Sequence, residues 1–130
     1  MDIKSEISTS IQQSERLLEL GLKKETADMV YNHSSMYVGS YKLKIIPYLP
    51  YDFVEKDIPA WSLARLWAML PIKVDELYKV LFDTSVAYET QMHTVTLPLT
   101  FTKSSDVFDN IIDCIEYLIK AKLFPEEYLH

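Results

Sequence analysis

The 130-residue sequence predicts an α+β fold, with about three helices packed against one face of a small antiparallel sheet. Two kinds of periodicity predict it. Apolar residues recur at helical spacing in three segments, and they alternate with polar residues in two others. No repeat or Gly/Ser-rich linker interrupts the chain, so we expect residues 1–130 to form a single domain.

The first helix is predicted over Ser5–Leu20, where apolar side chains recur at helical spacing and glutamine and glutamate side chains face outward. Gly21 follows at the position where a residue with positive φ ends a helix, and Leu22 can supply the apolar contact of a Schellman motif. A short helical turn is expected at Glu25–Val30.

A period of two predicts a half-buried strand over Tyr37–Ile46, which two prolines terminate. The segment Tyr48–Lys56 is expected to be a loop. Pro59 opens a second helix over Ala60–Leu70, whose almost entirely apolar composition predicts burial on more than one side, at the centre of the core.

The segment Val74–Phe82 fits both a helix and a strand, and the β-favouring residues Val86–Thr90 favour a strand pair. Alternation is clearest over Thr94–Thr102, which is predicted to be a strand. Pro98 on its outer side indicates an edge strand, since proline removes a ladder hydrogen bond.

A last helix is predicted over Asp106–Lys122, with Ser104 or Ser105 as its cap. Eight apolar residues are expected to form the core: Trp61, Leu66, Trp67, Leu97, Leu99, Ile111, Ile115 and Leu118.

Composition excludes several functional classes. With only Gly21 and Gly39, the chain cannot contain a dinucleotide or phosphate loop of the common glycine-rich types. The single cysteine gives no sign of an oxidising compartment, and the polar N-terminus is unlike a signal peptide. No apolar run is long enough to span a membrane, so a cytoplasmic protein is expected. The net charge of −6 argues against nucleic-acid binding.

The residues that carry chemistry form no recognised catalytic or metal-binding constellation. Cys114 lies in the middle of a helix among isoleucines, which is typical of an inert packed cysteine. His33, His93 and His130 are too far apart for any common metal motif, and no cofactor is expected. Four carboxylates share one face of the last helix, either as its solvated side, which we favour, or as a docking stripe or cation site: Asp106, Asp109, Asp113 and Glu116.

Five tyrosines fall within twenty-one residues, and two lysines are interleaved among them. This pattern is compatible with stacking of single-stranded nucleic acid, with packing of a sheet face, or with a protein-contact surface. Because the chain is acidic, we favour a surface for a protein partner. The residues predicted to form it are Tyr37, Tyr41, Tyr48 and Tyr51.

Three segments together resemble a group of small uncharacterised proteins carried by bacterial prophages and integrated elements. They are Ser14–Met29 (SERLLELGLKKETADM), Ile58–Pro71 (IPAWSLARLWAMLP) and the acidic-apolar ending Ser105–Phe124. The resemblance implies a compact α+β fold and a bacterial cytoplasmic setting, and it implies no catalytic residues.

The leading hypothesis is therefore a non-enzymatic accessory or protein-interaction module of a prophage-like element. A small ligand-binding protein or non-standard enzyme is an alternative, which a deep pocket lined by His33 or His93 beside a carboxylate would favour. A third hypothesis is an acidic decoy for a basic partner, which requires the last helix's carboxylates to cluster with Asp75–Glu76 on one exposed face.

Overall fold

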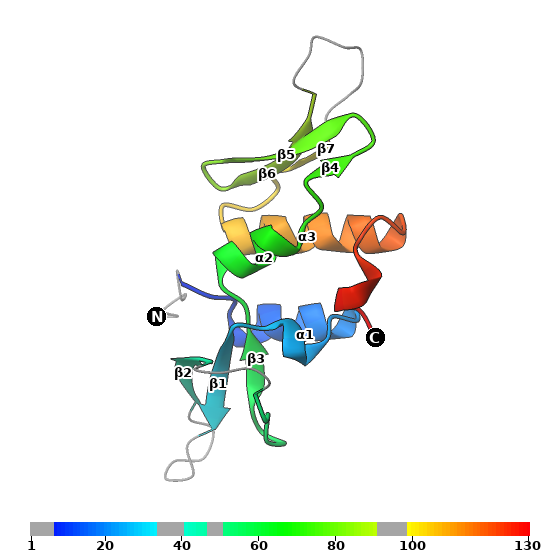
Figure 1. Ribbon diagram of the computed structural model, residues 1–130. Coiled ribbons are helices and arrows are strands. Elements are labelled where there is room, and N and C mark those ends of the chain that lie inside the picture. The colour runs from blue at the N-terminus through cyan, green and yellow to red at the C-terminus, as the bar shows by residue number, and fades with distance from the viewer. Residues whose placement is uncertain (1–6, 34–40, 47–50, 91–98) are drawn as a thin grey trace. The chain divides into compact units, whose positions relative to one another are not determined.

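The computed structural model describes residues 7–33, 41–46, 51–90 and 99–130 (Figure 1). The described elements, in chain order, are α1 (Ile11–Glu19), the 3₁₀ turn η1 (Lys24–Thr26), β1 (Met29–His33), β2 (Tyr41–Ile45), β3 (Ile58–Ala60), α2 (Leu63–Met69), β4 (Lys73–Val74), β5 (Leu77–Phe82), β6 (Ser85–Glu89), β7 (Leu99–Phe101), α3 (Val107–Lys120) and the 3₁₀ turn η2 (Glu126–Tyr128).

The α+β class, the three helices and the antiparallel pairing are confirmed, but the expectation of one sheet is wrong. The described strands form a three-stranded sheet in the order β2-β1-β3 and a four-stranded sheet in the order β4-β5-β6-β7. The chain forms two compact units, of which unit 1 comprises residues 1–66 with 128–130 and unit 2 comprises residues 67–127.

The sheet of unit 1 has β1 as its central strand, with β2 and β3 antiparallel on either side. The sequence pattern predicts neither β1, which it assigns partly to a helical turn, nor β3, whose Ala60 it assigns to a helix. Because β1 and β3 were not predicted, the predicted strand at 37–46 had no partners other than the later strands, and a single sheet was expected. Of that predicted strand, Tyr41–Ile45 is confirmed and 37–40 lies outside the described residues.

The first helix begins later than predicted. Ser10 and Gln13 form a capping box, in which the Ser10 hydroxyl accepts from the Gln13 amide and the Gln13 side chain accepts from the Ser10 amide. The helix therefore begins at Ile11 rather than Ser5. Its end is as predicted: Gly21 has φ of +106°, and the amides of Gly21 and Leu22 donate to the carbonyls of Leu18 and Leu17.

Polar side chains of unit 1 are buried together with its apolar ones. The Thr9 hydroxyl accepts from the Trp61 amide at 3.1 Å and lies 2.8 Å from the Ser14 hydroxyl. The Tyr31 hydroxyl donates to the Thr9 carbonyl at 2.7 Å. The C-terminus joins the same unit, because Leu129 forms an antiparallel bridge with Leu22. The buried apolar residues of this unit are Leu17, Leu22, Ala27, Met29, Val30, Ala60, Trp61 and Leu66.

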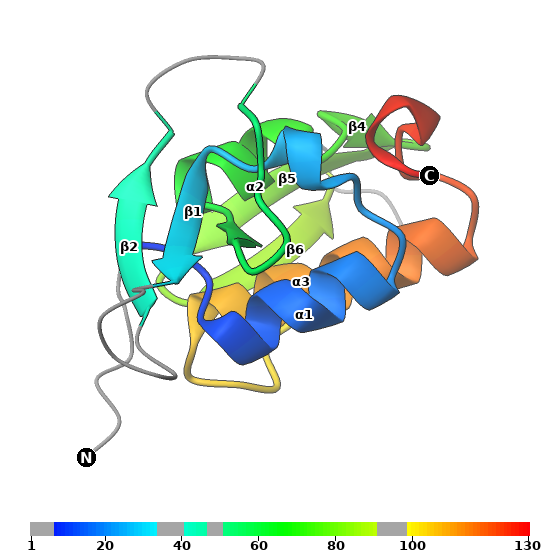
Figure 2. The same cartoon turned by 90° about the horizontal axis from the view of Figure 1, so that it is seen from below.

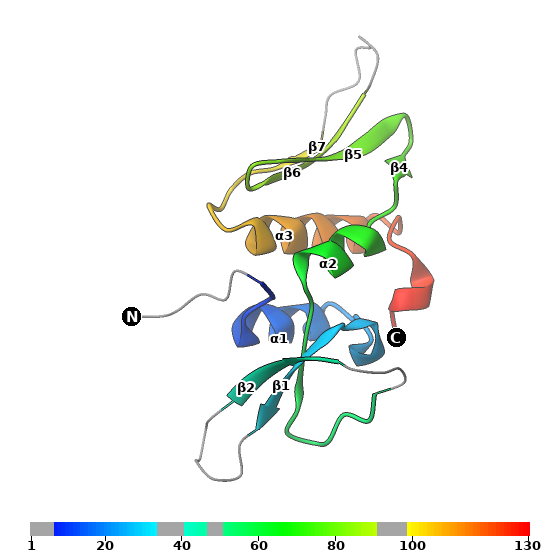
Figure 3. The same cartoon turned by 60° about the vertical axis from the view of Figure 1, so that its left-hand side comes forward.

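In unit 2 the four strands form a meander, and α3 lies against one face of their sheet (Figure 3). The strand pair that we favoured for 74–90 is confirmed as β5 and β6, which pair from Tyr78↔Glu89 to Phe82↔Ser85. β7 is an edge strand of the described sheet, as predicted for the Thr94–Thr102 segment. Pro98 itself lies outside the described residues.

The second and third helices depart from prediction at their starts. α2 begins at Leu63, because Ser62 caps it: the Ser62 hydroxyl accepts from the Arg65 amide at 3.1 Å. This helix was expected to be buried on more than one side. The expectation is wrong for the side that carries Ala64 and Ala68, because both residues are exposed. The cap of α3 is Asp106, whose carboxylate accepts from the Phe108 amide at 2.9 Å, and not a serine.

The predicted core is largely observed. Trp61, Leu66, Ile111, Ile115 and Leu118 are fully buried. Two members of the predicted set are wrong, since Trp67 and Leu99 are only half-buried. Leu97 lies outside the described residues.

Candidate functional site

Strand β2 is the most exposed strand of the described residues and forms one edge of its sheet (Figure 2). Tyr41, Lys42, Lys44 and Ile45 are exposed, and Leu43 is half-buried. Ile45 is an apolar side chain with 74% of its surface in solvent. Within the described ranges β2 pairs with β1 alone, so its other side presents backbone groups outward.

The register identifies which backbone groups point outward. The Ile46 amide donates to the Asp28 carbonyl at 3.0 Å, and Lys44 pairs with Val30 in the same ladder. In an antiparallel ladder, hydrogen-bonded pairs alternate with pairs that are not hydrogen-bonded. Lys42 and Lys44 therefore direct their amide and carbonyl groups toward β1. The amides and carbonyls of three residues point to the outer edge: Tyr41, Leu43 and Ile45.

The side chains of β2 divide between the two faces of the sheet, because successive side chains of a strand point in opposite directions. Tyr41 lies opposite His33 on β1, and the two rings meet edge to face at 5.3 Å between centroids. Leu43 and Ile45 share this face. Lys42 and Lys44 lie on the other face, opposite Asn32 and Val30. The edge thus has an apolar face and a cationic face.

The structure separates the two predicted partner-binding tyrosines that it describes. Tyr41 lies on the face of His33. Tyr51 lies on the opposite face, because its hydroxyl accepts from the side chain of Asn32 at 3.2 Å. The same Asn32 amide also donates to Asp57 at 3.1 Å, and Tyr51 packs edge to face on Phe53. Tyr37 and Tyr48 lie outside the described residues.

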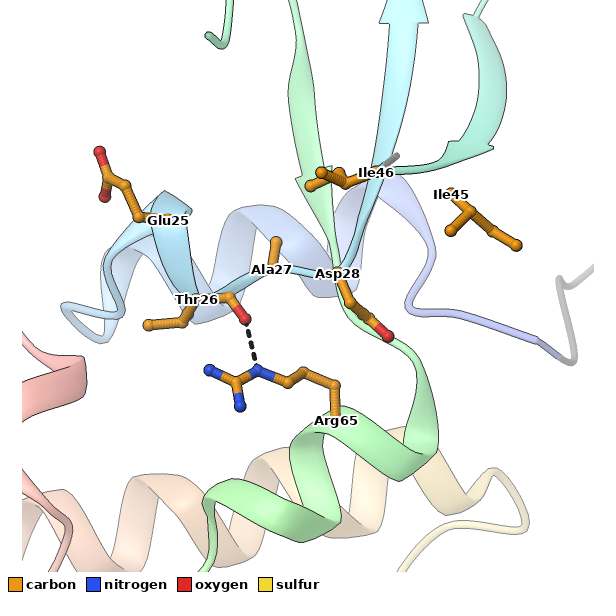
Figure 4. Close-up of a pocket in the computed structure, with 7 residues that line it drawn as sticks. All are labelled: Glu25, Thr26, Ala27, Asp28, Ile45, Ile46 and Arg65. Carbon is orange, nitrogen blue, oxygen red and sulfur yellow. Dashed lines mark hydrogen bonds between the residues drawn. The ribbon is translucent and has the colours of Figure 1, made fainter. Parts of the chain in front are cut away.

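A hollow of about 330 Å³ lies in unit 1, next to the end of β2 (Figure 4). Its lining residues are Glu25, Thr26, Ala27, Asp28, Ile45, Ile46 and Arg65. Arg65 reaches into it from α2, where its Nε donates to the Thr26 carbonyl at 2.7 Å and its guanidinium lies 5.5 Å from the centre of the Tyr128 ring. The carboxylate of Glu25 is directed away from this guanidinium (Figure 4).

The polar groups around the hollow largely serve the local structure. Asp28 accepts from both the amide and the hydroxyl of Ser62, and so supports the residue that caps α2. The Thr26 hydroxyl accepts from the indole of Trp61 at 2.9 Å and donates to the Lys23 carbonyl at 2.6 Å. Neither His33 nor another described histidine lines the hollow, so it lacks the histidine expected for the ligand-binding alternative.

The nucleophile candidate is buried, as predicted. Burial raises the pKa of the Cys114 thiol to about 12, so the reactive thiolate is scarce at neutral pH. Burial also raises the pKa of Tyr88, whose hydroxyl donates to the Pro71 carbonyl at 2.7 Å. Within the described ranges, no three His, Cys, Asp or Glu side chains are grouped so that they could hold a metal ion.

Lys79 in unit 2 is a residue that sequence reasoning missed. Its ammonium donates to the carbonyls of Trp67 and Leu70 at 2.7 and 3.1 Å, and it lies 4.7 Å from the centre of the Trp67 ring. Burial lowers the pKa of Lys79. Because both of its acceptors belong to the end of α2, Lys79 is a C-terminal cap for that helix.

The carboxylates of the last helix take part in local interactions rather than forming a free acidic face. Asp106 caps α3, Asp109 accepts from the Ser104 hydroxyl at 3.1 Å, and Glu116 pairs with Lys120 at 3.4 Å. The four carboxylate residues, including Asp113, are half-buried. The acidic-decoy hypothesis, which also needs Asp75–Glu76 on the same face, stays a prediction.

We find no protein-family model, no curated protein and no solved structure that matches this chain. Among the helices of the described segments, none combines the length and the apolar character that crossing a bilayer requires.

Proposed function

We propose that this chain is a non-enzymatic protein-interaction module that binds an extended segment of a partner protein along the outer edge of β2. One observation carries the proposal. Tyr41, Leu43 and Ile45 direct their amides and carbonyls away from β1, so a fourth strand can extend the sheet by the same ladder.

The chemistry of added strands fits the exposure of β2. Main-chain hydrogen bonds supply affinity that is independent of sequence, and side chains at alternate positions supply specificity. Three outward residues offer three donors and three acceptors, and each hydrogen bond contributes about 0.5–1.5 kcal/mol net. The exposed side chains of Tyr41 and Ile45 add apolar surface at the same edge. An accessory role in a prophage-like element, as the sequence resemblance implies, is part of the proposal.

Proline substitution tests the proposal, because the Leu43 amide points outward. Leu43→Pro removes one outward donor but no hydrogen bond to β1, and prolines are tolerated on edge strands in this orientation. Leu43→Ala is the matched control, since it shortens the side chain and keeps the amide. Both variants and the wild type would be used to capture partners from a lysate of cells that carry the gene.

We expect Leu43→Ala to retain a captured partner and Leu43→Pro to lose it, while circular dichroism shows that both variants keep the fold. In the complex, the amides of Leu43 and Ile45 should become protected from hydrogen exchange. A partner that Leu43→Pro captures as well as wild type does would refute binding along β2.

A second candidate function is the binding of a small carboxylate in the hollow beside Arg65. The observation that favours it is the guanidinium, for which the described residues provide one hydrogen-bond acceptor, the Thr26 carbonyl. The volume of about 330 Å³ lies at the lower end of ligand pockets. Thermal shift with millimolar acetate and short aliphatic carboxylates tests this function, with Arg65→Gln as control. A melting temperature that does not change with these anions would exclude it.

A further inference from the structure

The charge on β2 limits which strand can pair with it. Lys42 and Lys44 are both exposed, and their side chains project from the same face of the sheet. Any strand added at the outer edge places its own side chains beside these two ammonium groups. Like charges directly opposite one another destabilise a strand pair, and opposite charges stabilise it.

A second copy of the same strand is a poor occupant. If two β2 strands pair antiparallel about Leu43, Lys42 of one copy lies opposite Lys44 of the other. The outward residues form the hydrogen-bonded pairs in this arrangement, so the lysines form the pairs with the closer spacing, about 4.5 Å between Cα atoms. Shifting the register by two residues places Lys42 opposite Lys42, or Lys44 opposite Lys44. Each of the three antiparallel registers that join more than one outward residue of each copy therefore brings lysines together.

An acidic strand reverses the sign of these pairs. Resting on the proposed function, we infer that the partner segment is an extended peptide with Asp or Glu at two positions that are two residues apart, separated by an apolar residue. Its carboxylates lie beside Lys42 and Lys44 on one face. The apolar residue lies on the other face, beside Leu43 and its neighbours Tyr41 and Ile45. The repulsion between lysines then disfavours self-association, and their attraction to carboxylates favours the acidic partner.

Selection from a random peptide library tests the inference without a known partner. Peptides displayed on phage would be selected on the wild-type protein and counter-selected on Leu43→Pro, so that only peptides that need the outward Leu43 amide survive. We expect the survivors to carry acidic, apolar and acidic residues in alternation. Selection on Lys42→Glu/Lys44→Glu should instead enrich alternating basic residues.

Affinities then measure the contribution of charge. For an enriched acidic peptide, Lys42→Glu/Lys44→Glu should weaken binding at least roughly five-fold, since two attractive pairs become repulsive. Lys56→Glu/Lys103→Glu is the matched control, because it changes the net charge equally with two exposed lysines outside β2. Added salt should weaken the binding of the acidic peptide to the wild type. It should weaken the binding of a neutral peptide to the double variant less.

The outcomes distinguish the two levels of the proposal. Survivors without alternating acidic residues would overturn the inference and leave binding along β2 in place. If every selected peptide also binds Leu43→Pro, so that none survives the counter-selection, the proposed function itself would be overturned. A wild-type dimer that Leu43→Pro dissociates, or an oligonucleotide that displaces the acidic peptides, would also overturn the inference, because the edge would then have another occupant.

Discussion

The hydroxyl of Thr26 forms two hydrogen bonds in the interior of unit 1. It accepts from the indole Nε1 of Trp61 at 2.9 Å and donates to the Lys23 carbonyl at 2.6 Å. Trp61 is fully buried and Thr26 is 7% exposed, so water cannot readily replace either partner. Thr26→Val removes the hydroxyl while it preserves the shape of the side chain.

The expected cost follows from the groups left behind. The indole N–H of Trp61 loses its acceptor, and a buried donor without a partner costs about 1–3 kcal/mol. The Lys23 carbonyl is not orphaned, because the amide of Thr26 still donates to it at 3.0 Å. We therefore expect Thr26→Val to lower the free energy of unfolding by about 2 kcal/mol, the middle of that range.

Urea denaturation followed by far-UV circular dichroism measures this loss. Thr26→Ser keeps the hydroxyl and should recover most of the stability. A double-mutant cycle with Trp61→Phe isolates the bond, since the cost of Thr26→Val should largely vanish once the indole donor is gone. If Thr26→Val unfolds within about 0.5 kcal/mol of wild type, or if its cost is the same with and without the Trp61→Phe substitution, the bond does not stabilise the fold as argued.

Four further predictions test the fold and the site. Gly21→Ala should lower stability by about 1–2 kcal/mol in the same assay, since an alanine at φ of +106° is strained although nothing lies within 4 Å of its Cβ; an unchanged midpoint would contradict this. Asp106→Ala should cost about 1 kcal/mol through loss of the α3 cap, and Asp106→Asn should cost much less. Because the pKa of Cys114 rises from 9.0 to about 12, its thiolate fraction near pH 8 falls roughly 1000-fold, and a thiol reagent should label the folded protein far more slowly than the unfolded one. Hydrogen exchange of the free protein should alternate along β2, with the amides of Lys42 and Lys44 protected and those of Leu43 and Ile45 exchanging quickly; uniform protection would refute the outward edge.

The elements that sequence predicted best are those fixed by local chemistry. Gly21 ends α1 because a positive φ is needed there, and that requirement can be seen in the sequence itself. The apolar stripe of α3 follows from periodicity, whereas the hairpin of β5 and β6 was indicated by the β-favouring residues Val86–Thr90, because periodicity at Val74–Phe82 fits a helix as well as a strand. Caps were less predictable, because Ser104, Ser105 and Asp106 are all good capping residues and only the observed backbone shows which one is used.

The missed strands show where local patterns fail. Met29–His33 contains Val30 and Tyr31, which favour strands, but the segment is short and follows the turn at Lys24–Thr26. Ile58–Ala60 contains a proline, which is expected to start a helix and is tolerated here because β3 is an edge strand. Both segments become strands by pairing with residues distant in the sequence, and a local window does not contain those partners.

The two tyrosines of the predicted surface that the structure describes show a related limit of local patterns. Crowding of tyrosines between residues 31 and 51 suggests one surface, but Tyr41 and Tyr51 lie on opposite faces of the sheet that contains β1 and β2. Tyr41 contacts His33 and Tyr51 contacts Asn32, and adjacent residues of one strand point in opposite directions. A partner that needed both side chains would have to reach around the sheet. A partner strand along β2 needs only one edge.

The proposed recognition through a strand edge would also account for the lack of a recognised side-chain motif in this sequence. The groups that would bind are the backbone amides and carbonyls of Tyr41, Leu43 and Ile45. Backbone groups of this kind occur in every protein, and the pairing register with β1 alone determines which of them point outward. The side chains then have a second task, which is to prevent wrong pairings. Two lysines at alternate positions meet that task against copies of the same strand, and lysine is a common means of protecting an exposed edge. In the proposed complex the same two lysines would attract an acidic strand, so protection against self-association and selection of a partner would require no separate residues.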